Sequence, residues 1–350
     1  MNPDPLALSV IIPAYNRVEP LKYTLRAVAA AARRFGEPVE VLVIDDGSAP
    51  PIEEQLAGFD PGIPLTHRRQ TNQGCIAARM LGLSQARGEF VLLLDSDDLV
   101  HPDKFVAQVG AMRAAGSDVS HADLASAVRL PDYAVSEFAP AARIPATPDP
   151  VEFYVDRQPA VHDPVYRRDY LLRGLRERGG LPPRHLDAAG DVWIYFNLAL
   201  WPARITKVDR ALSAPGPHDE ERFSQHWENL AVPALLAMEL FLRVCPPGPG
   251  TAAVRSAVGA AAFRSWRGLP RGFNRNFARR MLAIYRQAPR PPLRALGGPA
   301  FGRLARLVGP LAAAWILRTA RRRRYEQVRT LTPVEYRRLF ANFGPADAPS

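Results

Sequence analysis

The first 125 residues alternate short apolar runs with amphipathic stretches, which is the pattern of an α/β domain. Three runs are nearly all apolar, as strands buried on both faces of a sheet are: 8–13, 39–44 and 89–94. Apolar residues recur at helical spacing in three further stretches: 19–34, 74–86 and 102–115. Weaker strand patterns occupy 63–68 and 119–124. The alternation predicts a mainly parallel sheet with crossover helices.

The pattern changes after residue 125. Residues 126–190 are punctuated by prolines and predict no clear element, whereas 188–201 has helical spacing. Beyond Glu228, Pro/Gly breaks separate four runs that predict helices: 232–244, 252–266, 273–288 and 304–326. We therefore expect an α/β domain over 1–228 and a helical region over 229–350.

Composition identifies a globular chain whose charge is divided unevenly. With 350 residues, 47% of them hydrophobic and 23% charged, a mainly disordered chain is excluded. The net charge is +10, but residues 251–350 hold 20 arginines against three acids. The first 250 residues hold the other 25 basic and 32 acidic residues. Such asymmetry predicts two parts with different partners.

Targeting and redox signals are sparse. Residues 2–4 (Asn-Pro-Asp) stand where a signal peptide has its basic region. The longest late apolar run, 307–317, has 11 residues and contains a proline, which is too short to span a bilayer. Cys75 and Cys245 alone supply neither a disulfide framework nor a cysteine-based zinc site. We expect a cytoplasmic protein, soluble or peripheral on the cytoplasmic face of the inner membrane.

Carboxylates gather where two of the predicted strands end. Asp45 and Asp46 follow the second strand, and Asp95, Asp97 and Asp98 follow the third apolar run. Loops beyond the carboxyl ends of parallel strands line the ligand crevice of an open α/β sheet. Gathered carboxylates repel one another unless donors or a cation compensate them, and Mg²⁺ or Mn²⁺ bound with phosphates does so. One cluster alone would fit turn and helix-cap residues equally well, but two at equivalent strand ends favour a site.

Common phosphate-binding motifs are absent from the sequence. Residues 13–16 (Pro-Ala-Tyr-Asn) follow the first strand without a glycine, which excludes a dinucleotide-binding turn. The sequence also contains no GxxxxGK[ST] loop and no GxSxG elbow. We therefore expect phosphate to be bound through a metal rather than by a backbone cradle.

Four motifs in order carry a resemblance to a known family: 9–16 (SVIIPAYN), 43–48 (VIDDGS), 72–74 (NQG) with Ala78-Arg79, and 94–98 (LDSDD). Together they resemble the family 2 glycosyltransferases of the GT-A fold, over about residues 6–125 and more weakly over 160–225. The resemblance implies a Rossmann-like, mainly parallel sheet with helices on both faces, here followed by a basic α-helical region. It also implies a metal-dependent enzyme of the hexosyltransferase type, which moves a sugar with inversion from a nucleotide-diphosphate sugar, UDP-sugar favoured, with Mg²⁺ or Mn²⁺.

The same resemblance assigns roles to individual side chains. The nucleotide-sugar-binding residues that it implies are Pro13, Ala14, Tyr15, Asp46, Arg79, Asp95 and Asp97. Asp97 would hold the ribose, Asp98 the metal, and Asp95 would support the loop. Arg79 would support the diphosphate or pair with Asp95, and a solvated helix arginine is the alternative.

An inverting displacement also needs a base that takes the proton of the acceptor hydroxyl. Family members place an acid there at a helix start, commonly as Glu-Asp. Residues 190–193 (Gly-Asp-Val-Trp) fill the corresponding place, so Asp191 is the candidate catalytic base and Asp187 its rival. Gly190 stands where glutamate is common, and a helix N-cap is the structural alternative for Asp191.

Two further segments have family counterparts. Residues 212–218 resemble the closing segment, in which a histidine completes the metal shell, so His218 is a second metal candidate, with a loop histidine as the alternative. Residues 225–227 (Gln-His-Trp) do not reproduce the QxxRW motif of processive members, which favours transfer of a single sugar. His162 and Asp163 are candidates for acceptor contacts, with packing or turn roles equally open.

The arginine-rich region from 229 to 350 lies outside this resemblance. Its arginines interleave with aromatic residues, which suits an anionic membrane surface. A packed helical bundle with solvated arginines, or a homodimer interface, is the alternative, and we place nucleic acid behind both.

For the whole chain we expect a transferase that acts on a hydroxyl acceptor, a glycan or a lipid-linked glycan, in bacterial surface-glycan or glycolipid biosynthesis. A non-catalytic nucleotide-sugar or carbohydrate-binding module on the same fold is the alternative.

Overall fold

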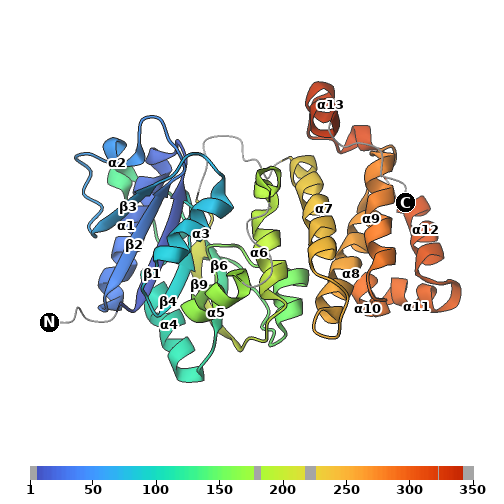
Figure 1. The fold of residues 1–350 in the computed structure, drawn as a ribbon, viewed down its shortest axis with the longest axis horizontal. Helices are drawn as coiled ribbons and strands as arrows, with labels where there is room; N and C mark the ends of the chain where they lie inside the picture. Colours follow the sequence, from blue (N-terminus) through green and yellow to red (C-terminus); the bar gives the residue numbers. More distant parts are fainter. Residues whose placement is uncertain (1–5, 177–182, 217–225, 322, 342–350) are drawn as a thin grey trace. The chain divides into compact units, whose positions relative to one another are not determined.

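The computed structural model describes residues 6–176, 183–216, 226–321 and 323–341 (Figure 1). The chain forms two compact units. The first comprises Met1–Phe153, Gln158–Asp187 and Trp201–Asp219. The second comprises Tyr154–Arg157, Ala188–Leu200 and Glu220–Ser350.

A mixed β-sheet forms the centre of the first unit. Its strands are β1 (Leu8–Ala14), β2 (Val39–Asp45), β3 (Leu65–Arg69), β4 (Phe90–Leu93), β5 (Leu99–Val100), β6 (Val119–Ser126), β7 (Ala139–Ala142), β8 (Val165–Arg167) and β9 (Ile205–Ala214). The order across the sheet is β3-β2-β1-β4-β8-β6-β9-β5, and β7 pairs with β6. Neighbours from β3 to β4 are parallel, whereas β8 runs antiparallel to both β4 and β6. The five predicted strands are confirmed, and β5, β7, β8 and β9 are strands that the sequence pattern did not predict.

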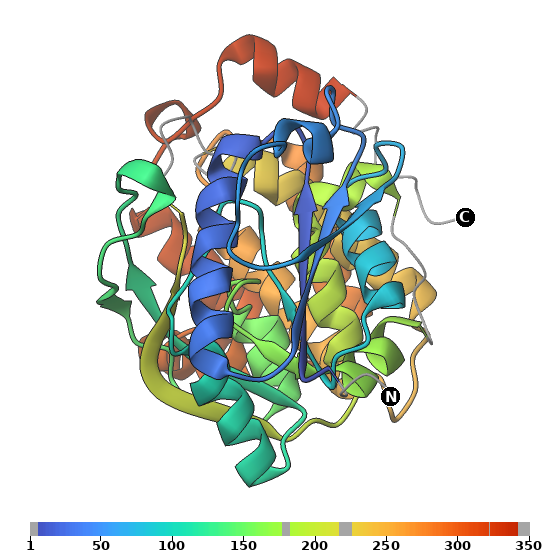
Figure 2. The same ribbon diagram turned by 90° about the vertical axis from the view of Figure 1, so that its left-hand side faces the viewer.

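Helices cover both faces of this sheet (Figure 2). The helices of the first unit are α1 (Val18–Phe35), α2 (Ile52–Gln55), α3 (Cys75–Gln85), α4 (Lys104–Ala115) and α5 (Arg168–Arg176). Apolar residues of α1 and α4 join one core with Val10 and Ile12 of β1. On the opposite face α3 lies so close that a Cβ at Gly82 would approach Ile11 Cγ2 to 2.4 Å. Alternate β1 side chains point to opposite faces, so β1 is buried on both sides, as its all-apolar sequence predicts.

The register of the central strands fixes where a ligand crevice can form. β1 pairs with β2 up to Ala14 opposite Asp45, and Ile11 pairs with Leu93 of β4. The carboxyl ends of these three parallel strands therefore lie side by side. Along the sequence, β2 and β3 are added on one side of β1 and β4 on its other side. The strand order therefore reverses at β1, which makes this edge a topological switch point.

The second unit is helical. Its helices are α6 (Gly190–Leu198), α7 (Trp227–Val244), α8 (Ala252–Gly268), α9 (Arg275–Gln287), α10 (Leu293–Leu296), α11 (Pro299–Val308), α12 (Pro310–Arg321) and α13 (Pro333–Ala341). Buried aromatic residues, among them Phe241 and Phe263, form its core. No helix within the described ranges has the length and apolar character that crossing a bilayer requires.

One predicted helix of this unit is wrong. The run 304–326 is divided into α11 and α12, which meet at Gly309 and Pro310. Gly309 adopts a φ of 81°, a left-handed conformation that ends α11, and Pro310 starts the next helix, where its missing N–H costs nothing. The apolar periodicity continues across this break and therefore did not predict it. The break follows from the backbone conformation of Gly309 and from Pro310.

Candidate functional site

A pocket of about 490 Å³ opens at the carboxyl ends of β1, β2 and β4. Segments far apart in the sequence line it, and they include six of the predicted nucleotide-sugar residues: Pro13, Ala14, Tyr15, Asp46, Asp95 and Asp97. The remaining lining residues are Arg17, Asn72, Gly74, Cys75, Ser96, Arg184 and Asp187. The strand register explains most of this convergence, because the residues of 13–17, 46, 72–75 and 95–97 lie at or after the ends of parallel strands on the same edge. Arg184 and Asp187 reach the pocket from a short 3-10 helix, Arg184–Ala189.

The two acids after β2 have different partners. Asp45 accepts hydrogen bonds from the backbone N–H groups of Ser48 (2.7 Å) and Ile52 (3.1 Å), so it shapes the turn and does not line the pocket. Asp46 accepts from the backbone N–H groups of Gln73 and Gly74, both at 2.8 Å. Asp46 thus fixes the loop that leads into α3, and it reaches the pocket wall at the same time.

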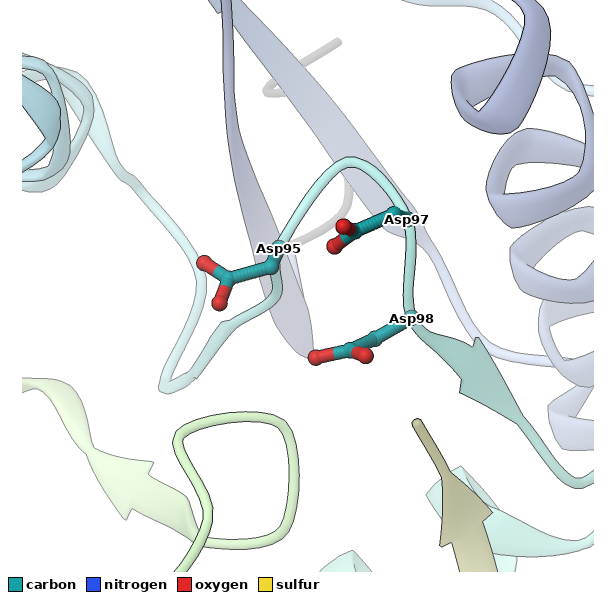
Figure 3. Close-up of side chains that lie close together, drawn as sticks. All are labelled: Asp95, Asp97 and Asp98. Atoms are coloured by element: carbon teal, nitrogen blue, oxygen red, sulfur yellow. The ribbon is translucent and has the colours of Figure 1, made fainter. Parts of the chain in front are cut away.

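The acidic turn after β4 brings Asp95, Asp97 and Asp98 together (Figure 3). One carboxylate oxygen from each lies within 4.8 Å of the others. The hydroxyl of Thr24 on α1 lies 3.1 Å from the Ser96 carbonyl oxygen and 2.9 Å from that of Asp98, which attaches the turn to the first helix. The Thr24 hydroxyl therefore fixes the backbone of the turn that carries the three carboxylates.

Arginines compensate two of these three carboxylates. Arg17 approaches Asp97 at 2.7 Å, with 46% of the arginine side chain exposed and 15% of the aspartate side chain. Arg79 approaches Asp95 at 2.5 Å, and its own side chain is buried. Arg79 does not line the pocket, so the structure favours its role as the partner of Asp95 and excludes a solvated helix arginine.

The side chain of Asp98 contacts the buried imidazole of His162. The Asp98 Oδ2 atom lies 2.5 Å from His162 Nδ1, and its Oδ1 atom accepts from the backbone N–H of Gly216 at 3.2 Å. Burial alone would lower the pKa of His162, but the charge of Asp98 and the hydrogen bond to it outweigh burial, and the net pKa is raised. Gly216 has no room for a side chain, since a Cβ there would lie 1.6 Å from the Asp97 carbonyl oxygen.

The suggested acceptor contacts of His162 and Asp163 are wrong. Both residues are buried, at 5% and 1% exposure. The Asp163 carboxylate accepts from the backbone N–H of Ala122 at 2.8 Å, and its carbonyl accepts from the buried Lys104 ammonium at 2.7 Å. The packing alternative holds, because this segment lies under the acidic turn rather than at the surface.

Asp187, the rival candidate base, lines the pocket. Its two oxygens accept from the backbone N–H groups of Cys75 (2.8 Å) and Ile76 (2.9 Å) at the start of α3. A carboxylate at a helix N-terminus is stabilised by these N–H groups and by the helix dipole. Gly74 permits the contact, since it has a φ of 99° and a Cβ there would lie 2.8 Å from Asp187 Cγ.

Asp191 lies in the first turn of α6. The residue at the N-cap is Ala189, so Asp191 is not the cap of this helix. Asp191 belongs to the second unit, whereas the pocket belongs to the first. His218, the second metal candidate, lies outside the described residues.

Three residues that line the pocket lie outside the motifs and the candidate residues taken from the sequence: Arg17, Cys75 and Arg184. Arg184 donates to the Asn72 side-chain oxygen at 2.5 Å, which joins two walls of the pocket. Arg17 and Cys75 directly follow the motifs 9–16 and 72–74, and that adjacency is the signal by which they were identifiable. The pairing of His162 with Asp98 spans 64 residues and leaves no local signal.

The acidic turn suits a hard divalent cation. Its donors are carboxylate oxygens, which Mg²⁺ and Mn²⁺ prefer. Each Asp98 oxygen already has a protein partner, but a carboxylate oxygen has two lone pairs and can accept twice. The donor set therefore fits a metal shared with ligand oxygens.

Comparison with known proteins agrees with this geometry. Residues 9–128 match the family model described as glycosyl transferase family 2. The chain is 30% identical over 173 residues to the succinoglycan biosynthesis protein ExoO of Rhizobium meliloti. This match covers 47% of this chain and 48% of that protein. It is 37% identical over 117 residues to an undecaprenyl-phosphate 4-deoxy-4-formamido-L-arabinose transferase of Pectobacterium carotovorum, covering 32% and 35%. A glycosyltransferase of Rickettsia conorii is 35% identical over 114 residues, or 33% of this chain, and the match spans only 18% of that protein.

Solved structures extend the likeness beyond the matched sequence. The crystal structure of S. aureus TarS 1–349 superposes with a TM-score of 0.57 at 19% identity, covering 90% of this chain and 92% of that one. The first unit thus has the GT-A fold, and the helical region follows it. The resemblance stated from the four motifs is confirmed over residues 9–128, the part of the chain that matches the model of glycosyl transferase family 2.

Proposed function

We propose that the protein is an inverting glycosyltransferase that moves a single sugar from a nucleotide-diphosphate sugar, UDP-sugar favoured, to a hydroxyl acceptor. The acceptor is proposed to be a glycan or lipid-linked glycan of the bacterial surface, as the names of the R. meliloti and P. carotovorum relatives suggest. A TarS structure in complex with UDP-GlcNAc, with a TM-score of 0.56, supports the class of donor.

One observation carries the proposal. Residues from three motifs, each following a different parallel strand, meet in one pocket beside a turn of three carboxylates. If these residues served only as turn or helix-cap residues, nothing would require the three motifs to converge. A nucleotide diphosphate requires this combination of an open surface for the base, acceptors for ribose hydroxyls and oxygen ligands for a cation.

The pocket residues divide the recognition of the donor. Tyr15 is 48% exposed at the pocket and offers an aromatic face to the nucleobase. Asp97 is proposed to accept from ribose hydroxyls, with Arg17 holding its orientation. Asp98, with Asp95 and Asp97 beside it, would hold Mg²⁺ or Mn²⁺. A bound divalent cation would neutralise charge that grows on the departing diphosphate.

Asp191 is proposed as the base that removes the proton of the acceptor hydroxyl. It lies in the first turn of a helix, as the family resemblance implies. Asp187 remains the rival. Its position at the pocket supports it, but both of its oxygens are already bonded to α3, which favours a structural role.

The test of this function is a calorimetric screen of nucleotide sugars with and without Mn²⁺. We expect one UDP-sugar to bind at micromolar Kd with Mn²⁺ and at least tenfold more weakly without it, because the cation bridges diphosphate and carboxylates. Inorganic diphosphate controls for binding of the charge alone. Failure of every nucleotide sugar to bind, with the chain shown to be folded by circular dichroism, would contradict the proposal.

A non-catalytic nucleotide-sugar or carbohydrate-binding module is the second candidate, and a specific observation favours it. Gly190 stands where the family commonly has glutamate before the base. Such a module would bind the donor in the same screen but would neither hydrolyse nor transfer it. Release of UDP by the purified chain, with or without acceptor, separates the two candidates.

The helical region is proposed to lie against an anionic membrane surface. Six of the twelve exposed large apolar side chains among the described residues fall within 307–317, and we call them the apolar patch: Leu307, Val308, Leu311, Trp315, Ile316 and Leu317. Exposed Arg303 and Arg306 stand beside it on α11. Apolar side chains that enter the headgroup region, flanked by bases that attract anionic lipid, are typical of interfacial helices.

Flotation with liposomes tests the membrane proposal. We expect binding to vesicles with anionic lipid and about tenfold weaker binding after Leu307→Ser with Trp315→Ser, because two exposed apolar side chains lose their burial in lipid. Val128→Ser is the matched control, since Val128 is 60% exposed in the first unit. Flotation of the double variant equal to that of the wild type would overturn the proposal. Salt-sensitive binding of the wild type to nucleic acid, without binding to anionic vesicles, would overturn it as well.

A further inference from the structure

The second unit contains a large apolar cavity of about 890 Å³. One face of α7 supplies a wall with side chains at helical spacing: Trp227, Ala231, Ala234 and Met238. Phe277 and Met281, one turn apart on α9, supply the facing wall. At one end the Trp227 indole N–H donates to the Val328 carbonyl at 3.1 Å, so even the polar atom of this wall is satisfied within the protein.

The charged side chains that the structure describes on the cavity walls are positive. Arg267 and Arg323 are the charged residues along the lining, and none of the described lining residues is acidic. Arg267 donates to the Leu296 carbonyl at 2.9 Å, and its guanidinium lies 4.5 Å from the centre of the Phe301 ring. Within the described residues no carboxylate pairs with Arg267. Burial and the neighbouring charge of Arg264 both lower its pKa, which means that its positive charge is left partly uncompensated.

We propose that this cavity binds a lipid anion, with one hydrocarbon chain along the α7–α9 walls and a phosphate headgroup at Arg267 and Arg323. The apolar walls match a hydrocarbon chain, and a phosphate supplies the negative charge that Arg267 lacks. A neutral apolar ligand would leave the arginine uncompensated, and a cationic amphiphile would be repelled.

Access to the cavity is consistent with a ligand that comes from a membrane. Leu317 belongs both to the cavity lining and to the apolar patch. Ser265, Gly268 and Ala300 of the lining are exposed, so the cavity reaches the surface of the unit. The shared Leu317 side chain is therefore the point at which a lipid chain held at the patch would meet the cavity. The site does not depend on sugar transfer, because the described residues that line it and those that line the donor pocket are different.

The experiment is calorimetric titration of the full chain with dodecyl phosphate, below its micelle concentration and without nucleotide sugar. We expect saturable binding that weakens about fourfold for each methylene removed from the alkyl chain, the fold-change expected for a buried CH₂ group. Dodecyl maltoside and dodecyltrimethylammonium carry the same chain with a neutral or positive headgroup, and we expect both to bind at least tenfold more weakly. Inorganic phosphate alone tests the headgroup.

Two variants place the ligand within the structure. Ala234→Phe fills the space between the α7 and α9 walls, and Arg267→Met removes the charge while keeping the apolar stem. We expect each to weaken dodecyl phosphate binding at least tenfold. Ala253→Phe on the exposed face of α8 and Arg286→Met on α9 add the same volume and remove the same charge outside the cavity, and we expect both to bind like wild type.

The outcomes separate clearly. Loss of binding in both cavity variants, with binding kept in both controls, supports the site. Wild-type binding by Ala234→Phe would show that the chain lies elsewhere, and equal binding of dodecyl maltoside would show that no anion is recognised; either result overturns the proposal. If circular dichroism shows that Ala234→Phe does not fold, Ala231→Val narrows the same wall with a smaller side chain and is judged by the same criterion. Because no sugar donor is present, failure here leaves the transferase proposal untouched.

Discussion

Replacing Asp98 by asparagine should reduce sugar transfer about 10²–10³-fold, the scale on which loss of one charge-stabilising group lowers turnover. The substitution keeps the shape of the side chain and an oxygen that can still accept from His162 or from the Gly216 N–H. It removes the negative charge that attracts a divalent cation to the acidic turn. Measured as kcat/KM with the donor found by the calorimetric screen, transfer should fall, and the tenfold gain in donor affinity from Mn²⁺ should disappear.

Asp118→Asn is the matched control for that variant. Asp118 directly precedes β6, and its carboxylate likewise accepts one backbone hydrogen bond, from the N–H of Arg204 at 2.9 Å, but it does not belong to the acidic turn. We expect this control to transfer sugar at the wild-type rate. Unchanged turnover of Asp98→Asn would rule out the proposed role of Asp98.

A second readout of Asp98→Asn does not involve activity. In the wild type the charge of Asp98 raises the pKa of His162 above 6.5 in spite of burial. Without that charge burial dominates, so an NMR titration of the imidazole should find a lower pKa for His162 in the variant than in the wild type. An unchanged titration would mean that His162 and Asp98 do not interact as described.

The donor side of the site was predictable because its signals are local. β1, β2 and β4 are short and almost wholly apolar, and a strand with that composition is buried on both faces of a parallel sheet. Parallel strands place their carboxyl ends at one edge, so acids that follow separate strands must come together. Asp46 and Asp95 therefore met in one pocket as expected.

Elements that depend on distant partners were not predictable in this way. β9 (Ile205–Ala214) contains Lys207, Asp209 and Arg210, and its sequence has no apolar run; its place in the sheet comes from pairing with β6. β8 has only three residues and is fixed between β4 and β6. Local patterns carry no information about such tertiary pairing.

The same distinction explains the misread side chains. His162 and Asp163 precede a short strand in a proline-rich stretch, a context typical of surface loops. Their burial follows from the position of β8 beneath the acidic turn, and their charges are tolerated because each is bonded: His162 to Asp98, and Asp163 to the N–H of Ala122.

Replacing Asp191 by asparagine should lower transfer about 10²–10⁴-fold, the usual contribution of a positioned general base, with the donor Kd changed less than twofold. An amide cannot take the acceptor proton, whereas nothing in the pocket that binds the donor is altered. Single-turnover kinetics with saturating donor measure the chemical step directly. Partial recovery of Asp191→Ala by added formate would identify the missing group as a carboxylate.

Asp187→Asn is the informative partner of that variant, because the two substitutions are chemically identical and four residues apart. Asparagine has a single acceptor oxygen, so the N–H of Cys75 or Ile76 loses its partner at the start of α3. We expect donor binding to weaken about tenfold, since this loop forms a wall of the pocket, and kcat at saturating donor to fall much less. The reverse result, with Asp187→Asn binding donor normally but failing to transfer and Asp191→Asn active, would assign the base to Asp187, because only the residue that accepts the proton can abolish chemistry while leaving donor affinity intact.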